Sequence, residues 1–256
     1  MLDPNEAAAI AEEFGVARTQ VRRDHLISHL LAAVSEHLPG EVLFFGGTAL
    51  SRTFAPHGRL SEDIDLIAHG NRSRTAKALD TILLRATRRE YPGLRWQPAL
   101  SAVSNSTPAV LVAPDGTSVR IQLLSPTGYP PWPVEPQAIT QRYSDTPPAT
   151  LNVPTAPAFT AWKTVAWTQR AASRDLYDLW LLARLGLITA DAAELFKRFG
   201  PTNRPPADTL FTDAPEEPTW TRELAGQTRL NVTATAALNE VRQAWSTATQ
   251  ARSGQI

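Results

Sequence analysis

The sequence predicts an α+β protein, with a mixed sheet in its N-terminal half and helices alone in its C-terminal half. Up to residue 124, short apolar runs of strand length are interspersed with segments of helical periodicity. From residue 158 onward only the helical periodicity recurs. Between the two, residues 125–157 are rich in proline, which favours a long semi-rigid connection. We therefore expect two domains, residues 1–150 and residues 151–256.

In the N-terminal half, a helical segment leads into two short strands. Apolar positions recur every three to five residues over 3–38, and a Pro-Gly pair ends this segment. The apolar run 42–45 predicts a buried strand that enters Gly46-Gly47-Thr48, where a short helix begins. Residues 64–68 then resume as a strand. This segment, in the order strand, glycine turn, helix, strand, contains the candidate catalytic residues.

The remaining elements follow the same two periodicities. We expect a helix at 72–90, strands at 94–100, 109–112 and 119–124, and helices from 158 onward, the last near 231–249. Asp115-Gly116, between the last two strands, predicts a hairpin turn. A second proline-rich stretch near 201–218 interrupts the C-terminal helices.

The composition excludes several kinds of site. The chain has no cysteine, which excludes disulfides, thiol catalysis and zinc–thiolate sites and leads us to expect a cytoplasmic location. Basic and acidic residues are equal at 25 each, so the net charge does not indicate a polyanionic partner. No apolar run approaches the roughly 20 residues that cross a bilayer. The acidic N-terminal segment lacks the basic and apolar regions of a signal peptide.

Asp63 and Asp65 form the predicted centre of the active site. Alternation in a strand places both side chains on one face, while Ile64 and Leu66 point into the core. Two carboxylates held close together repel each other, and a bound divalent cation relieves that repulsion. Mg²⁺ prefers oxygen ligands and commonly bridges carboxylates to substrate phosphates. The pair therefore predicts a metal site for one or two magnesium ions.

Gly46-Gly47-Thr48 supplies the complementary half of a nucleotide site. Two glycines permit a close approach of the backbone to a phosphate, and the Thr48 hydroxyl adds a donor. Alone, a Gly-Gly pair is usually a plain turn, and a lone Asp-x-Asp is usually surface charge or a cap. Together and in this order they favour phosphoryl transfer, which requires mainly charge neutralisation and alignment.

The wording of these two motifs resembles a known family. Gly46 to Leu50 (G-G-T-A-L) followed by Arg59 to Leu66 (R-L-S-E-D-I-D-L) is similar to the nucleotidyltransferase toxins of the AbiEii/MenT type, in the DNA polymerase β-like superfamily. The resemblance implies a polymerase β-like nucleotidyltransferase domain with a mixed sheet, followed by an all-helical domain that closes over the active site. It also implies a toxin–antitoxin system, with Mg²⁺-dependent transfer of a nucleoside monophosphate from an NTP to the 3′ end of tRNA, blocked translation and a separately encoded antitoxin.

A second motif at 163–179 is the one that the resemblance leads us to expect. In this family a lysine precedes a helix with the pattern R-D-x-x-D-L, and both contribute to the nucleotide site; here these are Lys163 and Arg174 to Leu179. Lys163 can reach a triphosphate as a point charge, although an exposed helix lysine is the plain alternative. Asp175 and Asp178 lie on one helix face. Asp175 suits capping or dipole compensation, whereas Asp178 is a candidate to orient Lys163 or to act as general base.

The chain departs from the superfamily at the third acid of the metal site. Polymerase β-like enzymes usually carry a carboxylate on a later strand beside the Asp pair, and the best candidate strand, 118–124, has Gln122 there. An amide oxygen is a weak ligand for Mg²⁺, so a three-carboxylate, two-metal site is in doubt. Either Asp178 supplies the missing charge or one metal enters with the nucleotide, and the number of ions stays open.

The arginines around the glycine turn complete the candidate site. Arg52 and Arg59 could clamp phosphate in a bidentate way, or form salt bridges at the helix surface. The predicted catalytic residues are Asp63, Asp65, Lys163 and Asp178; the predicted nucleotide-binding residues are Gly46, Gly47, Thr48, Arg52, Arg59 and Lys163. The helix at 72–90 carries basic residues that form either an RNA-facing strip or a solvated face: Arg72, Arg74, Lys77, Arg85, Arg88 and Arg89.

Two other functions remain open at this point. A nucleotidyltransferase of this kind can modify a small molecule, such as an aminoglycoside, or a protein hydroxyl, and the destination of labelled NTP would distinguish these acceptors. Gln122 also leaves room for a non-catalytic nucleotide-binding or regulatory module, which would bind Mg-NTP without transferring it.

Overall fold

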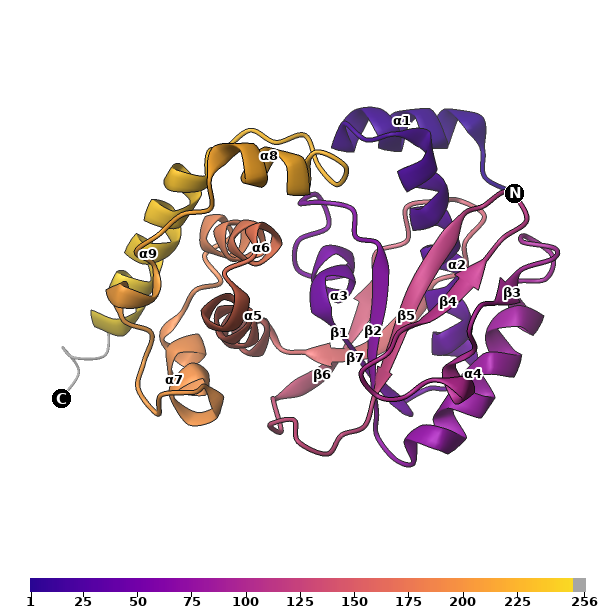
Figure 1. Cartoon of the computed structure of the whole chain (residues 1–256), viewed down its shortest axis with the longest axis horizontal. Coiled ribbons are helices and arrows are strands. Elements are labelled where there is room, and N and C mark those ends of the chain that lie inside the picture. The colour runs from indigo at the N-terminus through magenta and orange to yellow at the C-terminus, as the bar shows by residue number, and fades with distance from the viewer. Residues whose placement is uncertain (251–256) are drawn as a thin grey trace. The chain divides into compact units, whose positions relative to one another are not determined.

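The computed structural model describes residues 1–250, in two compact units (Figure 1). One unit contains residues 1–129 and 134–153, and the other contains residues 130–133 and the chain from residue 154 onward. Residues 251–256, the end of the predicted C-terminal domain, lie outside the described residues. Within the described part, no helix is long and apolar enough to cross a membrane.

The first unit is built on a mixed sheet of seven strands, which confirms the predicted α+β class. The strand order is β3-β4-β5-β2-β1-β7-β6. Their bounds are β1 Val42–Phe45, β2 Asp63–Ala68, β3 Arg95–Trp96, β4 Ala109–Val112, β5 Ser118–Leu124, β6 Val134–Ile139 and β7 Ala149–Pro154. β2 pairs antiparallel with β1 and parallel with β5, and β1 pairs parallel with β7. The strand that carries the two aspartates is therefore central.

The helices of this unit pack on the sheet and on one another. The predicted helical segment 3–38 is two helices, α1 Pro4–Phe14 and α2 Arg18–His37, because Gly15 adopts the left-handed conformation (φ 65°) and ends the first. The other two helices are α3 Gly46–Arg52 and α4 Arg72–Ala86. α2 contacts β5 and α4, and apolar α2 side chains such as Leu26 and Leu30 are fully buried in the core.

The proline-rich segment 125–157 is not only a connection, as the sequence led us to expect, because it contributes β6 and β7 to the sheet. The two prolines inside these strands stand where a missing N–H is tolerated. Pro136 lies in β6 at the edge of the sheet, and Pro154 is the last residue of β7. Leu151 and Val153 are buried, as alternation in a strand requires.

The predicted strand at 94–100 is shorter than expected. Only Arg95–Trp96 pair as β3, and a short 3₁₀ helix, η1 Leu100–Ala102, follows. The carboxylate of Asp80 on α4 accepts hydrogen bonds from the backbone N–H groups of Leu100 (2.9 Å) and Ser101 (3.1 Å). These donors bind a side chain instead of a neighbouring strand, so the strand ends early.

The second unit is helical, as predicted. Its helices are α5 Ala156–Arg170, α6 Ser173–Arg184, α7 Ala190–Phe199, α8 Glu217–Leu224 and α9 Ala234–Gln250, with a short 3₁₀ helix, η2 Asp208–Leu210. α5 packs on α6 and α7, and α6 packs on α8 and α9. Trp220 and Trp245 are almost wholly buried in this unit, which fits core side chains.

Candidate active site

β2 presents Asp63 and Asp65 on the same face of the sheet. Ile64 and Leu66 are at most 1% exposed and point the other way, whereas both aspartates are partly exposed. Asp65 lies opposite Phe45, the last residue of β1, so its side chain stands beside the turn into α3. The alternation expected from the sequence is therefore present in the structure.

The two glycines that follow β1 lie close against charged side chains. Gly46 has φ +79°, and a Cβ atom there would collide with the carboxylate of Asp65. At Gly47, a Cβ atom would collide with the guanidinium of Arg59. The backbone at 46–47 is thus in direct contact with one acid of the pair and one predicted phosphate-binding arginine. The two motifs therefore meet in space at this turn.

Thr48 and Arg52, both predicted to contact the nucleotide, are engaged inside the unit. The Thr48 side chain is buried, and its hydroxyl donates to the backbone carbonyl of Asp63. The guanidinium of Arg52 is fully buried and donates to the carboxylate of Asp24 (2.8 Å) and the hydroxyl of Ser28 (2.8 Å). Burial lowers the pKa of Arg52 to about 10, and Asp24 opposes that shift. Thr48 therefore joins α3 to β2, and Arg52 joins α3 to α2 in place of the expected phosphate clamp.

β5 brings an arginine to Asp63. The parallel register pairs Asp63 with Arg120 and Asp65 with Gln122. The guanidinium of Arg120 donates to both carboxylate oxygens of Asp63, each at 2.8 Å. The hydrogen bond to Asp63 raises the pKa of Arg120. A small cavity of ≈270 Å³ lies beside Asp63 and is lined by Arg23, Glu62, Asp63, Ser118 and Arg120.

Gln122 occupies the strand position beside Asp65 that the sequence assigned to the missing acid. Its side-chain amide donates to the backbone carbonyl of Asn105 (3.3 Å). The fit of this site to Mg²⁺ therefore rests on two carboxylates, Asp63 and Asp65, on one strand face. Mg²⁺ usually keeps several waters and binds one or two carboxylates together with substrate phosphates, so this donor set suits it.

In the second unit, Lys163 on α5 is held by two acids of α6. Its Nζ lies 2.6 Å from Asp178 Oδ2 and 3.4 Å from Asp175 Oδ1, and its side chain is 10% exposed. Arg170 donates to both oxygens of Asp175, at 2.5 and 2.8 Å. Two cations and two carboxylates thus balance in charge, which buried ions require. Asp178 contacts the Lys163 ammonium and fixes its position, while Asp175 mainly binds Arg170 in the first turn of α6.

Comparison with known proteins identifies the family. The model of the AbiEii nucleotidyl transferase toxins of type IV toxin–antitoxin systems matches residues 29–249. The chain belongs to this family. No curated protein matches the sequence significantly.

Two solved structures share the fold of this AbiEii-family chain. MenT4, a nucleotidyltransferase toxin from Mycobacterium tuberculosis H37Rv, is similar with a TM-score of 0.69 and 19% identity, over 95% of this chain and 89% of that chain. A candidate nucleotidyltransferase from H. pylori is similar with a TM-score of 0.54 and 13% identity, over 94% of this chain and 99% of that chain. At these identities the likeness concerns the fold.

Family membership makes this AbiEii-type protein a nucleotidyltransferase enzyme and a toxin of a type IV toxin–antitoxin system. A nucleotide substrate and an antitoxin partner follow from that class.

Sequence reasoning missed two arginines at the site. Arg120 was recognisable, because alternation in Ser118–Leu124 places it on the same face as Gln122. Arg23, whose guanidinium lies 3.0 Å from the carboxylate of Glu62, had no such signal, since it reaches the site from α2.

Proposed function

We propose that this AbiEii-type enzyme transfers a nucleoside monophosphate from an NTP to the 3′-terminal hydroxyl of tRNA with the help of Mg²⁺, and thereby stops translation. The observation that best supports this proposal is the close contact between the Asp65 carboxylate and the backbone at Gly46. It joins a pair of metal-binding acids to a stretch of backbone without side chains, where phosphates can approach closely.

In this reaction the acceptor hydroxyl attacks the α-phosphate, the bond to the bridging oxygen of the β-phosphate breaks, and pyrophosphate leaves. Mg²⁺ on Asp63 and Asp65 would neutralise the phosphates and the charge that develops during transfer. Gly46 and Gly47 let the Asp65 carboxylate and the Arg59 guanidinium approach the backbone of the turn closely, and Arg59 adds positive charge for a phosphate. Arg120 must leave at least one oxygen of Asp63 for the metal to bind there.

Lys163 is proposed to contact the nucleotide phosphates, as the family pattern implies. Its 2.6 Å contact with Asp178 supports an orienting role for that acid. Lys163 is already held by two acids before the substrate binds. Its side chain therefore loses less conformational entropy when it binds phosphate. If Asp178 orients Lys163, the proton of the acceptor hydroxyl passes to solvent or to the metal-site acids.

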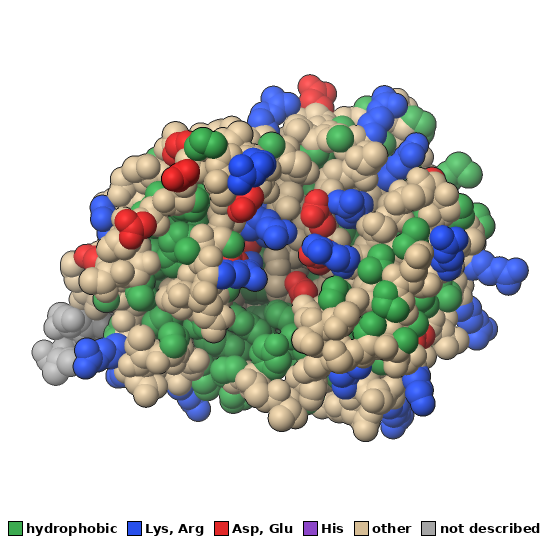
Figure 2. All heavy atoms as spheres, in the orientation of Figure 1, with side chains coloured by type: hydrophobic (Ala, Val, Ile, Leu, Met, Phe, Trp, Pro, Cys, Tyr) green, Lys and Arg blue, Asp and Glu red, His purple; other side chains and the backbone are tan. Residues whose placement is uncertain are grey.

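An RNA acceptor is supported by the basic residues of α4 and of the turn at 87–90 that follows it. Arg74, Lys77, Arg85, Arg88 and Arg89 are exposed, and Figure 2 shows basic side chains along the edge where Figure 1 places α4. Arg72 differs, because its guanidinium donates to the backbone carbonyl of Leu123 (2.7 Å). Several exposed cations within one short segment of the chain can contact several phosphates of an RNA backbone.

Incubation with each labelled NTP, Mg²⁺ and total tRNA tests the proposal. We expect labelled tRNA with at least one nucleotide and no labelling by the Asp63→Ala variant. If the label appears on a small molecule or a protein instead of tRNA, the proposed acceptor is wrong but the proposed nucleotidyl transfer stands. Binding of Mg-NTP with no transfer to any acceptor would reject the enzymatic role and leave a regulatory module, the alternative that Gln122 keeps open.

A further inference from the structure

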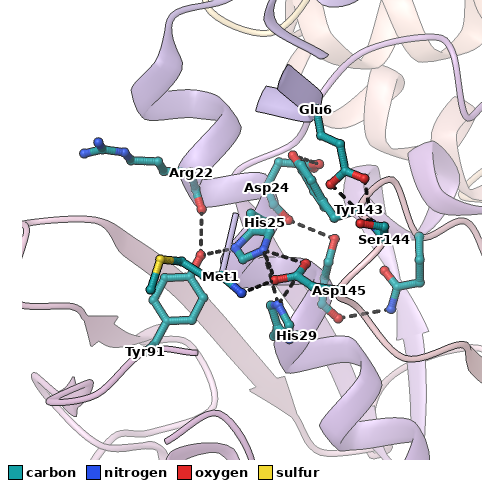
Figure 3. A network of polar contacts seen from close by, with 12 residues as sticks. Met1, Glu6, Arg22, Asp24, His25, His29, Tyr91, Tyr143, Ser144 and Asp145 are labelled. Atoms are coloured by element: carbon teal, nitrogen blue, oxygen red, sulfur yellow. Dashed lines mark hydrogen bonds and ion pairs between the residues drawn. The ribbon is translucent and has the colours of Figure 1, made fainter. Parts of the chain in front are cut away.

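Two buried histidines and an aspartate converge in the first unit, and none of the three is a residue assigned to nucleotidyl transfer (Figure 3). His25 and His29 lie one turn apart on α2 and are 2% and 6% exposed. Asp145 comes from the segment between β6 and β7 and is partly exposed. Among the described residues, this is the one group of three or more histidine and acidic side chains whose ligand atoms lie within 4.8 Å of one another.

The three ligand atoms have the spacing of a metal site. His25 Nε2 lies 3.0 Å from Asp145 Oδ1 and 3.3 Å from His29 Nε2. The third distance, from His29 Nε2 to Asp145 Oδ1, is 3.7 Å. Tetrahedral Zn²⁺ with bonds of about 2.0–2.2 Å places neighbouring ligand atoms about 3.3–3.5 Å apart. The observed triangle is therefore already close to the size that a tetrahedral ion needs.

The second ring nitrogen of His25, Nδ1, also has a partner that favours metal binding through Nε2. Its Nδ1 lies 2.5 Å from the hydroxyl of Tyr91, which can in turn donate to the backbone carbonyl of Arg22 at 3.4 Å. With its proton on Nδ1, His25 presents the lone pair of Nε2 to Asp145 and His29. Burial lowers the pKa of both histidines, which favours the neutral imidazole that metals bind. A partner on the second nitrogen that fixes the tautomer is usual for a metal-bound histidine.

We propose that His25, His29 and Asp145 form a binding site for a divalent transition-metal ion of the zinc class. The site is distinct from the magnesium position at Asp63 and Asp65. Two imidazoles and one carboxylate suit Zn²⁺ and its neighbours in the series, whereas Mg²⁺ selects oxygen ligands.

A cavity that could supply water as a fourth ligand lies beside His25. This residue and Tyr91 line a cavity of ≈470 Å³, from which water can complete the coordination. The amino group of Met1 lies 2.6 Å from Asp145 Oδ2 and lines the same cavity. Asp145 thus already binds a cation at this place, and the other carboxylate oxygen, Oδ1, faces the histidines.

An ion bound here would link α2 to the segment between β6 and β7, which contacts α3 after the glycine turn. Next to Asp145, the Tyr143 hydroxyl donates to Asp24 (3.0 Å), the acid that binds Arg52. Arg142 donates to the backbone carbonyl of Ser51 on α3 (2.7 Å). We therefore assign the ion a structural role, which predicts a higher melting temperature when it binds.

Metal binding by untagged, chelator-treated full-length protein tests the site without any nucleotide. We expect one Zn²⁺ per chain by competition with a chromophoric chelator, a rise in melting temperature, and with Co²⁺ the intense visible absorption of a tetrahedral complex. His29→Gln should weaken Zn²⁺ binding by more than about a hundredfold, since loss of an outer-sphere partner alone costs about 10- to 100-fold.

Two control variants separate this site from others. His57→Gln removes an exposed histidine paired with Glu13, and Asp63→Asn alters the proposed magnesium site; both should keep full Zn²⁺ affinity. Unchanged binding in His29→Gln, or loss of binding in Asp63→Asn, would overturn the proposal. If His29→Gln fails to fold, the wild-type protein decides: absence of both Co²⁺ absorption and stoichiometric Zn²⁺ rejects the site. Because no nucleotide is present, failure of the transfer assay leaves this result unaffected.

Discussion

The guanidinium of Arg120 donates to both carboxylate oxygens of Asp63, each at 2.8 Å. The pair is partly exposed, at 53% for Arg120 and 30% for Asp63, so the interaction is worth about 0.2–1 kcal/mol. That is enough to compete measurably with a weakly held Mg²⁺ for the same oxygens.

Arg120→Ala is therefore expected to lower the Mg²⁺ concentration for half-maximal transfer by up to about fivefold, the equivalent of about 1 kcal/mol. The measurement is the Mg²⁺ dependence of transfer at saturating NTP. Arg95→Ala, which removes another exposed arginine of the same unit, should change nothing. A Mg²⁺ requirement that stays the same in Arg120→Ala would show that the metal does not compete with this ion pair.

Asp63→Ala and Asp65→Ala are each expected to reduce transfer by more than about a hundredfold and to relieve growth arrest on expression. Each removes a metal ligand, and stabilisation of charge by a metal contributes several kcal/mol. Transfer to tRNA and growth after induction are measured together. Glu36→Ala is the control, because this acid on α2 is 71% exposed and its removal should leave toxicity unchanged. Persistent arrest in both aspartate variants would rule out the metal assignment.

Gly46→Ala is expected to abolish most activity and to destabilise the protein by at least about 1 kcal/mol. The added Cβ would displace the Asp65 carboxylate, and φ +79° is unfavourable for alanine. Thermal unfolding and transfer are compared with those of Gly70→Ala, where nothing lies within 4 Å of the new atom. Equal activity of the two variants would contradict the close contact between Gly46 and Asp65.

Lys163→Ala should lower kcat/KM for NTP and also destabilise the second unit. Removing one partner of a buried ion pair typically costs about 3–5 kcal/mol. Asp178→Asn keeps the shape of the acid but loses its charge, so we expect a smaller loss in both readouts. Steady-state kinetics and thermal unfolding give the measurement, with Lys197→Ala as the control because that lysine is exposed on α7. Full activity in a folded Lys163→Ala variant would exclude a role in nucleotide binding.

Charge reversal at Arg85 on α4 and at Arg88 in the turn that follows tests the RNA acceptor. The double variant Arg85→Glu/Arg88→Glu should raise KM for tRNA several-fold and reduce the salt dependence of its binding, because phosphate contacts release counterions. The affinity for Mg-NTP should not change. An unaltered KM for tRNA would mean that these arginines are a solvated helix face.

The sequence by itself determined the fold class and the local geometry of the motifs. Alternation in 63–66 placed both aspartates on one face. Helical periodicity placed Asp175 and Asp178 on one face, where both reach Lys163. These relationships span a few residues, so backbone periodicity alone specifies them.

Only the tertiary structure decided what each charged side chain contacts. Arg52 looked available to a phosphate, but it lies fully buried against Asp24, 28 residues away in sequence. Arg120 binds Asp63 from 57 residues away, and Asp145 meets His25 from 120 residues away. No local period encodes such pairs, because they depend on how strands and helices pack. The Asp pair could therefore be located from the sequence, whereas its competing arginine and the histidine cluster required the fold.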